Sequence, residues 1–419
     1  MKSNSSHIER SKFFLIGNPL GHSFSPMIHN AFGYDYETLE LTKDEIVSFI
    51  ASNKYDGFNV TIPYKIEIIK YLDSLDQSAI DAGSVNTVVR RKNSLIGYNT
   101  DVKGMRYMLN QASISLFGEK VLILGSGGTA KTAISLASNM GAREIVIVGR
   151  NSENNYSNLN LNYDADIIIN ATPVGMFPKN DERLIDITPF SKLNGVVEVI
   201  YNPRITDLLF QAKELKIKHT HGLRMLVAQA KYARDIFLDI TDCDSVIEKV
   251  YSSILSKTLN IVLIGMPSSG KTYVGEHLAK VLNRPFYDSD ALSVDKMGVS
   301  IPYAFETFGE SYFRQVEHEV CCGLGKKQGN VISVGGGAVF NGNCYHSLKQ
   351  NGIIVHLVRD LNLTDFSGRP LLTDIDALGK LFLKRFPLYN SMSDFSVSNN
   401  GLLIDTTSEI INKFNNLTK

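Results

Sequence analysis

Residues 260–278 read NIVLIGMPSSGKTYVGEHL, and this stretch predicts a strand, a loop and a helix in direct succession. The apolar run Asn260–Ile264 is typical of a buried strand, and Tyr273–Leu282 is typical of a helix. Between them, GMPSSGKT matches the phosphate-binding loop G-x-x-x-x-G-K-T in the context that this motif requires. The competing interpretation is a Gly/Ser turn that only leads into a helix.

Each residue type in the loop has a distinct expected task. The backbone N–H groups of Ser268, Ser269 and Gly270 would face an anion at the helix N-terminus. Lys271 would reach the terminal phosphates, and the Thr272 hydroxyl would ligate Mg²⁺. The loop therefore predicts binding of a nucleoside triphosphate such as ATP together with Mg²⁺.

Composition restricts the classes of partner. The chain has 419 residues, with 43 basic and 43 acidic side chains, and its length suggests about three domains. The balanced charge, without a basic tail or a run of like charge, argues against a partner that is a nucleic acid or a membrane surface. Small-molecule substrates are the expected partners.

Cysteine spacing and hydropathy indicate a cytoplasmic protein without a cysteine metal site. The four cysteines have no metal-ligand spacing: Cys243, Cys321, Cys322 and Cys344. The first residues, MKSNSSHIER, lack the apolar segment of a secretory signal. No later apolar run approaches the roughly 18 residues of a membrane span.

Strand-like and helical stretches alternate along the whole chain. Short apolar runs occur at 13–17, 121–125, 144–149, 165–170 and 260–265. Repeated alternation of strand and helix implies α/β domains with parallel sheets. The weakest pattern, VYSSILSKT at 250–258, marks the main expected boundary.

A glycine-rich turn follows the strand-like run VLILG and precedes the helical stretch Lys131–Met140. In this context it reads as a dinucleotide fingerprint, whose residues are Gly125, Ser126, Gly127, Gly128, Thr129 and Ala130. The next strand-like run ends at Arg150, where an acidic residue would bind the ribose of NAD. An arginine there favours the 2′-phosphate of NADP, although it is also compatible with a solvated strand end.

Four polar clusters precede this fingerprint, at 21–26, 59–65, 83–87 and 99–101. Taken singly each has an ordinary interpretation: Ser25 before a proline as a helix cap, Asn86 as a turn residue, Lys65 as a surface charge. Together they supply hydroxyls, an amide, a lysine and a carboxylate. This combination suits a small polyhydroxylated acid beside a nicotinamide.

Residues of about 11–250 resemble shikimate dehydrogenase through GHSFSP, NVTIPYK, GSVNT, NTD, GSGGTA, NATPVGM, YNP and GLRMLVAQA, in that order. The resemblance implies seven substrate-binding residues, spread over this part of the chain: Ser23, Ser25, Thr61, Asn86, Asp101, Tyr201 and Gln229. Ser23 and Ser25 would hold the carboxylate, and Tyr201 would line the substrate end of the cleft. The others would bind the ring hydroxyls.

The same resemblance assigns the chemistry. Lys65 would be the catalytic acid/base, because reduction of the C3 ketone of 3-dehydroshikimate needs a proton donor beside the developing alkoxide. Asp101 would orient and pair its ammonium, and Gly222 would line the nicotinamide end of the cleft. NADPH would provide the hydride.

Residues of about 259–410 resemble a second family, shikimate kinase. The phosphate loop is followed in order by Asp288-Ser-Asp290, Gly309-Glu-Ser-Tyr-Phe-Arg314, Gly335-Gly-Gly337, Arg369-Pro-Leu-Leu372 and Arg385-Phe-Pro-Leu-Tyr389. Any one of these carboxylates or arginines could be a surface ion pair. Their order behind a phosphate loop favours the resemblance.

This second resemblance implies a role for each motif. Arg314 and Arg385 would grip the shikimate carboxylate, and Asp290 would orient the 3-hydroxyl as nucleophile. Asp288 would act on Mg²⁺. The backbone around Gly336 would approach the substrate, and Arg369 would close from a lid onto the transferring phosphoryl. Lys271 would contribute to catalysis by neutralising phosphate charge.

Four features depart from these patterns. The stretch between Arg150 and Ala165 is shorter than the family's usual connection, which implies a missing helix and strand in the NADP domain. Glu198 stands where an aspartate is usual ahead of YNP. In the kinase half the lid stretch Arg359–Gly368 is short, and Asn399-Asn400 falls where an arginine commonly contacts the nucleotide.

We therefore expect a two-domain α/β dehydrogenase followed by a phosphate-loop kinase domain with a parallel sheet. The expected parts are a substrate domain at 11–101 and 222–250, a Rossmann-like NADP domain at 102–221, a linker at 251–258 and the kinase domain at 259–419. Two alternatives stay open. One is a quinate-type or NAD-using dehydrogenase fused to a kinase for a related hydroxy acid. The other is a shikimate sensor with one decayed site.

Overall fold

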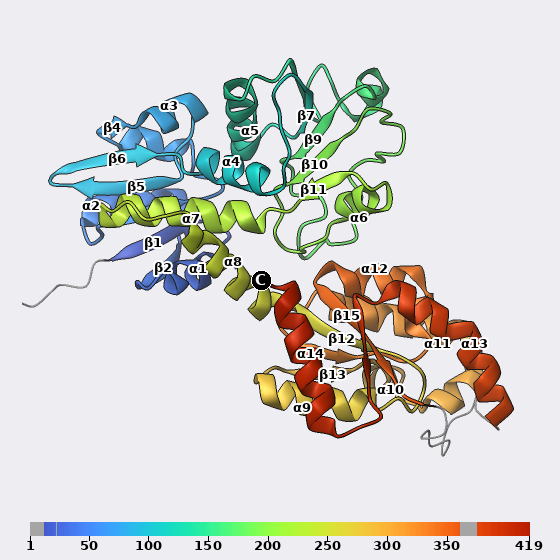
Figure 1. The fold of residues 1–419 in the computed structure, drawn as a ribbon. Helices are drawn as coiled ribbons and strands as arrows, with labels where there is room; N and C mark the ends of the chain where they lie inside the picture. The colour runs from blue at the N-terminus through green and yellow to red at the C-terminus, as the bar shows by residue number, and fades with distance from the viewer. Residues whose placement is uncertain (1–11, 22, 361–374) are drawn as a thin grey trace, which may run out of the picture. The chain divides into compact units, whose positions relative to one another are not determined.

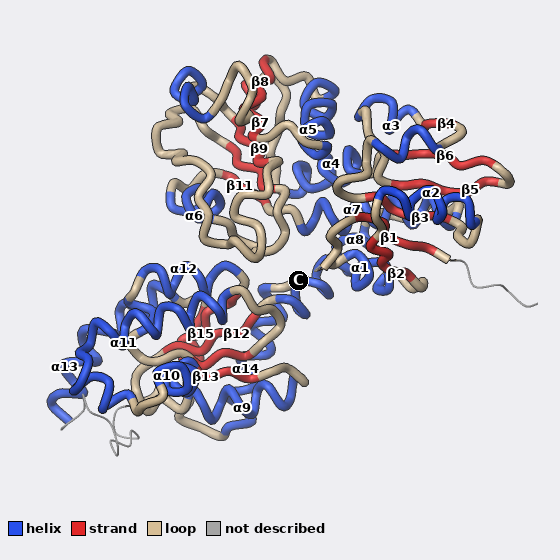
Figure 2. Tube along the Cα trace, turned by 180° about the vertical axis from the view of Figure 1, so that it is seen from behind, coloured by secondary structure: helices blue, strands red, loops and turns tan. Residues whose placement is uncertain are grey.

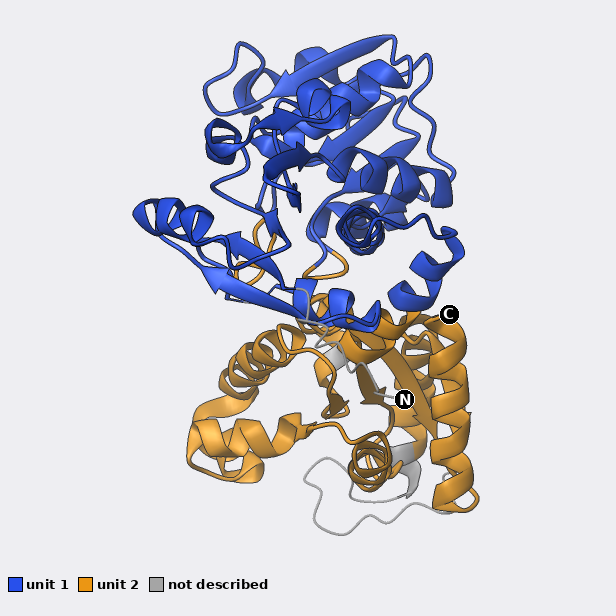
Figure 3. Cartoon of the chain, turned by 90° about the vertical axis from the view of Figure 1, so that its left-hand side faces the viewer, with its two compact units in different colours: residues 1–174, 183–201, 206–251 blue, residues 175–182, 202–205, 252–419 orange. Residues whose placement is uncertain are grey.

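The computed structural model of the chain describes residues 12–21, 23–360 and 375–419. It divides into two compact units, coloured blue and orange in Figure 3. Unit 1 comprises Met1–Val174, Arg183–Tyr201 and Thr206–Tyr251, and unit 2 comprises Gly175–Glu182, Asn202–Ile205 and Ser252–Lys419. Each unit is an α/β structure, so the predicted fold class is confirmed.

The first sheet of unit 1 has the strand order β2-β1-β3-β5-β6-β4. Its strands are β1 (Phe13–Gly17), β2 (Tyr36–Glu40), β3 (Gly57–Val60), β4 (Ser74–Leu75), β5 (Thr87–Arg91) and β6 (Ser94–Tyr98). The pairs β3–β5 and β5–β6 are antiparallel, so the predicted all-parallel arrangement is wrong for this sheet. The reason is the two-residue connection after Arg91, with Lys92 at φ 53°, since only an antiparallel pair can be joined so closely.

The second sheet of unit 1 is parallel throughout, in the order β11-β10-β9-β7-β8. Its strands are β7 (Lys120–Leu124), β8 (Glu144–Val148), β9 (Ile167–Asn170), β10 (Gly195–Glu198) and β11 (Lys218–Thr220). Strand β8 is at an edge of this sheet, and only the 3₁₀ helix η2 (Tyr156–Asn162) lies between it and β9. The short connection predicted after Arg150 therefore leaves no additional strand beyond β8.

The helices of unit 1 include the pair α4 and α7, which lie side by side and join the two sheets of the unit (Figure 1). The helices from the start of the unit to the end of α7 have these bounds: α1 (Ser25–Ala31), α2 (Lys43–Ser52), η1 (Glu67–Tyr71), α3 (Gln77–Ala82), α4 (Asp101–Gln111), α5 (Gly128–Asn139), α6 (Asp207–Glu214) and α7 (Leu223–Leu238). Helix α4 buries Met105, Met108 and Leu109 in the core that also contains β7. The α4–α7 pair therefore connects the two sheets, and it carries two of the predicted site residues, Asp101 on α4 and Gln229 on α7.

Unit 2 contains one parallel sheet in the order β13-β14-β12-β15-β16. Its strands are β12 (Asn260–Ile264), β13 (Phe286–Asp288), β14 (Val331–Ser333), β15 (Gly352–Val358) and β16 (Phe395–Ser398). Its helices are α9 (Lys271–Leu282), α10 (Ser289–Met297), α11 (Ile301–Gly325), η3 (Ala338–Phe340), α12 (Gly342–Gln350), α13 (Ile375–Met392) and α14 (Leu403–Leu417). Helices α9 and α14 cover one face, and α11 and α12 cover the other (Figures 1 and 2).

The predicted strands at 13–17, 121–125, 144–149, 165–170 and 260–265 correspond to β1, β7, β8, β9 and β12. The stretch expected as a linker, 251–258, is the second half of helix α8 (Ser245–Thr258). The division between the two units falls within this helix, after Tyr251. Along the described residues, no helix combines the length and apolar character that crossing a membrane requires.

Candidate active sites

An ion pair between Lys65 and Asp101 is the centre of the candidate site in unit 1. Lys65 follows β3, and Asp101 is the first residue of α4. The Lys65 Nζ lies 2.6 Å from Asp101 Oδ2, and their side chains are only 16% and 8% exposed. Because both groups are largely shielded from water, their mutual orientation is fixed more firmly than in a surface ion pair.

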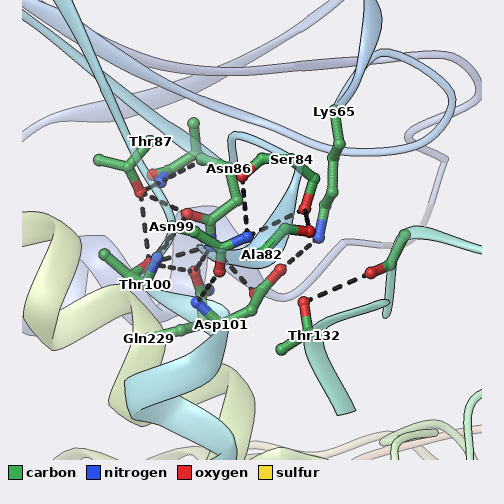
Figure 4. Close-up of polar contacts among 12 residues, drawn as sticks. Lys65, Ala82, Ser84, Asn86, Thr87, Asn99, Thr100, Asp101, Thr132 and Gln229 are labelled. Carbon is green, nitrogen blue, oxygen red and sulfur yellow. Dashed lines mark hydrogen bonds and ion pairs between the residues drawn. The ribbon is translucent and has the colours of Figure 1, made fainter. Parts of the chain in front are cut away.

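A buried amide, Asn86, holds the other side of this carboxylate (Figure 4). Its Nδ2 donates to Asp101 Oδ1 at 3.0 Å and lies 3.3 Å from Gln229 Oε1. Its Oδ1 accepts from the Thr100 backbone N–H at 2.8 Å. The structure thus brings together four of the residues predicted from separate clusters, although they are up to 164 positions apart in the sequence, as Lys65 and Gln229 are.

The predicted carboxylate-binding residues form a second cluster. Ser23 Oγ and Ser25 Oγ lie 3.1 Å apart at the start of α1, and the Ser25 N–H donates to Ser23 Oγ at 3.2 Å. The Tyr201 ring packs on Phe24 with centroids 5.0 Å apart. Burial raises the pKa of Tyr201, while hydrogen bonds with the Phe24 backbone and the Ser23 side chain act in the opposite direction. Thr61 follows β3 at the same end of the strand as Lys65.

The predicted dinucleotide loop precedes α5 and approaches Lys65. Gly125 has φ 111°, and a Cβ there would meet the Ala171 carbonyl oxygen at 3.1 Å. A Cβ at Gly127 would stand in open space, and one at Gly128 would lie 3.7 Å from Lys65 Cδ. The loop therefore reaches the Lys65 side chain at Gly128, and Thr129 and Ala130 follow directly in the first turn of α5.

Two further residues predicted to bind the cofactor follow strands of the same sheet, Arg150 after β8 and Gly222 after β11. Arg150 is exposed just beyond β8 and is close enough to Tyr156 to lower its pKa, against the stronger opposite effect of burial. Gly222 precedes α7, and a Cβ there would overlap the carbonyl oxygen of Val199. Only glycine lets the chain turn into α7 so close to the end of β10.

The phosphate loop of unit 2 is a backbone concavity that ends at α9. Gly270 has φ 88° and Ser268 has φ 62°, which turn successive backbone groups toward a common side. The buried Lys271 folds its Nζ onto the carbonyl oxygens of Gly265 and Met266, at 3.1 and 2.9 Å. The loop therefore keeps the lysine charge within it.

The two predicted Mg²⁺ residues are in contact. Thr272 Oγ1 donates to Asp288 Oδ2 at 2.8 Å, while Asp288 Oδ1 accepts from the Asp290 N–H at 2.9 Å as the cap of α10. One hydroxyl and one carboxylate suit Mg²⁺, which retains several water ligands in sites of this kind. No group of three or more His, Cys, Asp or Glu side chains in the described chain could hold a metal by itself, and all four cysteines are free.

The glycine run 335–337 lies among three predicted substrate residues. A Cβ at Gly335 would overlap Asp290 Oδ1, and a Cβ at Gly337 would lie 2.6 Å from Arg314 Nη1. Arg385 Nη1 donates to the Gly336 carbonyl oxygen at 3.0 Å. The missing side chains let one carboxylate and two guanidinium groups converge on bare backbone. Arg369 lies outside the described residues.

Comparison with known proteins shows to which family the first half of the chain is similar. It is 34% identical over 258 residues to the shikimate dehydrogenase (NADP(+)) of Clostridium beijerinckii, covering 57% of this chain and 96% of that protein. The chain belongs to the shikimate dehydrogenase family. Residues 15–88 match the family model described as the shikimate dehydrogenase substrate binding domain.

Solved structures agree with this assignment. A chorismate mutase/shikimate 5-dehydrogenase fusion from Clostridium acetobutylicum has 33% identity and a TM-score of 0.57, covering 59% of this chain and 97% of its own. The shikimate 5-dehydrogenase of Thermus thermophilus, in complex with NADP(H) and shikimate, has 25% identity and a TM-score of 0.53, covering 57% and 98%. Residues 267–415 match the shikimate kinase family model, so this shikimate dehydrogenase homologue also carries a shikimate kinase domain.

Sequence reasoning missed several residues of the dehydrogenase site. Tyr36 OH donates to Asn59 Oδ1 at 2.7 Å, and Asn59 Nδ2 donates to the Asn86 carbonyl oxygen at 3.0 Å and to Thr87 Oγ1 at 2.9 Å. Asn99 Oδ1 accepts from the Asp101 N–H at 3.0 Å. The available signal was the position of Asn59, Thr87 and Asn99 inside the quoted motifs.

Glu317 was missed in the kinase domain. It is 1% exposed, and its Oε2 accepts from Arg314 Nη1 at 2.7 Å. Burial raises the pKa of Glu317, while the charge of Arg314 acts in the opposite direction. The three-residue spacing from Arg314 on one helix was the signal that could have identified it.

Two of the other departures also have a structural outcome, while residues 361–368 of the short lid stretch lie outside the described residues. Glu198 is completely buried and accepts hydrogen bonds from Asn170 Nδ2, the Ile200 N–H and Thr206 Oγ1, at 2.9 to 3.0 Å. Burial raises its pKa to about 7 despite these donors. Asn399 donates from Nδ2 to the Ser269 carbonyl oxygen at 2.8 Å and so braces the phosphate loop.

Proposed function

We propose that unit 1 reduces 3-dehydroshikimate to shikimate with NADPH, and that unit 2 phosphorylates shikimate with ATP and Mg²⁺ to shikimate 3-phosphate. The observation that carries the first half is the shielded Lys65–Asp101 pair beside Gly128 of the dinucleotide loop. The second half rests on the phosphate loop and the convergence of Asp290, Arg314 and Arg385 on the glycine run. Shikimate is the product of one reaction and the substrate of the other.

In unit 1 the chain's own residues manage a proton. NADPH supplies a hydride to the C3 carbonyl carbon when it is bound. Lys65 then gives a proton to the ketone oxygen as negative charge develops there, which completes the hydroxyl and leaves a neutral amine that water reprotonates. Asp101 keeps the ammonium oriented, and Asn86 fixes the carboxylate from its other oxygen. Ser23 and Ser25 hold the substrate carboxylate.

The loop at 125–130 and Arg150 suit NADP. Gly125 and Gly127 leave the backbone bare for a pyrophosphate, and the exposed Arg150 beyond β8 can pair with a 2′-phosphate. An NAD-using or quinate-type enzyme is the rival proposal. Loss of the preference for NADPH over NADH in Arg150→Ala would support the role of Arg150, whereas an unchanged preference would contradict it.

In unit 2 the residues position and neutralise. Arg314 and Arg385 grip the shikimate carboxylate, and Asp290 aligns the 3-hydroxyl for attack on the γ-phosphoryl group of ATP. Thr272 and Asp288 would hold Mg²⁺, which neutralises phosphate charge when bound. Lys271 moves its charge from the loop carbonyl oxygens to the phosphates.

We also propose a cytoplasmic location, which cell fractionation tests.

A coupled assay on the purified chain tests both halves. It supplies 3-dehydroshikimate, NADPH, Mg²⁺ and ATP, and follows NADPH absorbance and shikimate 3-phosphate. Both signals are expected. NADPH loss without phosphorylation, or phosphorylation of added shikimate without NADPH oxidation, would identify a decayed site and favour a sensor. If the chain catalyses neither reaction, with these substrates or with any related hydroxy acid, the proposal is refuted.

Fusion fixes the two activities in equal amounts, but it does not by itself channel shikimate. A mixture of two full-length variants, Lys65→Met and Lys271→Met, offers one working site per chain. We expect the same lag before shikimate 3-phosphate appears as with the wild-type chain at equal site concentrations. A clearly shorter lag for the wild type would indicate channelling.

A further inference from the structure

A cluster of aromatic and charged side chains lies around the first turn of α7, within unit 1 and outside the ion-pair site. It contains His221, which directly precedes Gly222, and Arg224, two residues after Gly222, together with Glu248 and Tyr251 of α8 and Tyr107 of α4. We refer to these five residues as the α8 cluster. None of the five belongs to the residues expected to touch substrate or cofactor.

Tyr251 contacts His221 and Arg224, which lie before and after Gly222 in the sequence. It is 5% exposed, and its hydroxyl lies 3.2 Å from His221 Nε2. Its ring lies under the guanidinium of Arg224, with Cζ 4.3 Å from the ring centroid. Such a cation–π contact is strongest where water is excluded, as it is around this buried ring.

Glu248 fixes the same arginine from a second direction. Its carboxylate accepts from Arg224 Nε at 3.2 Å and from Arg224 Nη2 at 3.2 Å, which is a bidentate arrangement. Its Oε1 also accepts from Tyr107 OH at 3.0 Å. Burial raises the pKa of Tyr107 to about 12, with the Glu248 charge adding to the effect, so Tyr107 stays a neutral donor.

The cluster therefore ties α8 to the two helices whose first turns line the dehydrogenase site. Helix α4 begins at Asp101, and α7 follows Gly222, where a Cβ would overlap the Val199 carbonyl oxygen. The backbone turn at Gly222 therefore has little room to move, and a shift of His221 or Arg224 would displace it.

We propose that Tyr251 and Glu248 are positioning residues for the dehydrogenase reaction, which makes the first half of α8 a working part of that enzyme. They hold the turn at Gly222 in the place where the nicotinamide end of NADPH is expected. This inference rests on the proposed function of unit 1.

The test uses the full-length chain with Tyr251→Phe, which keeps the ring under Arg224, and Tyr251→Leu, which removes both contacts. Tyr232→Phe is the matched control, because it removes a comparable hydroxyl contact, Tyr232 OH to Asp244 Oδ2 at 3.0 Å, near the other end of α7. The measurements are the dehydrogenase kcat, the KM for NADPH, the KM for 3-dehydroshikimate, the kinase rate and the thermal midpoint.

We expect Tyr251→Phe to reduce kcat/KM for NADPH by about fivefold, the size of one lost hydrogen bond, and Tyr251→Leu to reduce it by about 20-fold or more. The KM for 3-dehydroshikimate and the kinase rate should stay within about twofold of the wild type, and Tyr232→Phe should match the wild type. A lower thermal midpoint with unchanged NADPH kinetics in both Tyr251 variants would overturn the positioning role. Equal losses for both substrates would also overturn it. A wild-type chain that does not oxidise NADPH would instead refute the proposed function on which the inference rests.

Discussion

The substitution Glu198→Gln should change how the stability of unit 1 depends on pH. Glu198 is completely buried between the ends of β9 and β10, and burial raises its pKa from 4.5 to about 7. Between these two values the folded chain keeps a proton on Glu198 that the unfolded chain releases. The wild-type protein therefore loses stability as the pH rises from 4.5 to 7, and little further change from this group is expected above 7.

The size of the effect follows from the width of that window. Each pH unit corresponds to about 1.4 kcal/mol, so the interval from about pH 5 to about pH 7 lowers the free energy of unfolding by about 2 to 3 kcal/mol. Glutamine at 198 carries no charge at any pH. It loses one of the two Asn170 hydrogen bonds, which costs about 1 kcal/mol at all pH values. Glu198→Gln should thus be about as stable as the wild type at pH 5 and about 2 kcal/mol more stable at pH 8.

Calorimetry between pH 5 and pH 8 can measure this change in relative stability. Two transitions are expected, and ligands assign them: NADP⁺ with shikimate should raise the transition of unit 1, and ADP with Mg²⁺ that of unit 2. The difference in unit 1 midpoint between variant and wild type should change by about 5 to 10 °C across the range. Glu214→Gln, at an exposed glutamate of α6, is the control. Parallel curves for Glu198→Gln and the wild type would refute the reasoning.

Three further substitutions test the site assignments. Lys65→Met should lower the dehydrogenase kcat by about 10²- to 10⁴-fold and leave the kinase rate unchanged, since it removes only the proton donor; turnover equal to the wild type in a steady-state NADPH assay would contradict the assignment. Lys271→Met should lower kinase turnover by about 10²- to 10³-fold and leave NADPH oxidation intact, measured in the same coupled assay. Gly222→Ala should destabilise unit 1 by about 1 to 3 kcal/mol and weaken NADPH binding, because its Cβ overlaps the Val199 carbonyl oxygen; unfolding curves and NADPH titration would check both effects.

Local motifs were the part of the fold that the sequence predicted well. The phosphate loop and the dinucleotide loop each have a strand before and a helix after, as predicted, because strand, turn and helix signals are encoded within about 20 neighbouring residues. The antiparallel β5–β6 hairpin was not predicted. Its turn, with Lys92 at φ 53°, lacks the Asn-Gly or Asp-Gly pair that usually announces such a connection.

Contacts between distant segments explain what the sequence could not give. Asn86 and Gln229 were singled out by motif, but their 3.3 Å approach depends on packing of α4 against α7. The support of Asn86 by Asn59 and Tyr36 depends on the pairing of β1 with its two neighbours, which periodicity does not specify. Glu198 is a further case, because its hydrogen bond with Asn170 depends on the register between β9 and β10.

The two units meet a common metabolite with different chemistry, and the reactions explain the difference. Reduction of a ketone needs one proton at one oxygen, so unit 1 surrounds a single Lys65–Asp101 pair with neutral amides and hydroxyls that hold it still. Phosphoryl transfer needs no proton donor of that kind, but it brings a carboxylate and several phosphate charges into one space. Unit 2 accordingly places Arg314, Arg385 and Asp290 around the glycine run 335–337, and Lys271 in the phosphate loop. In the proposed reaction Asp290 would align the hydroxyl that reacts. The arrangement of charge in each unit thus follows from the bond that it must make.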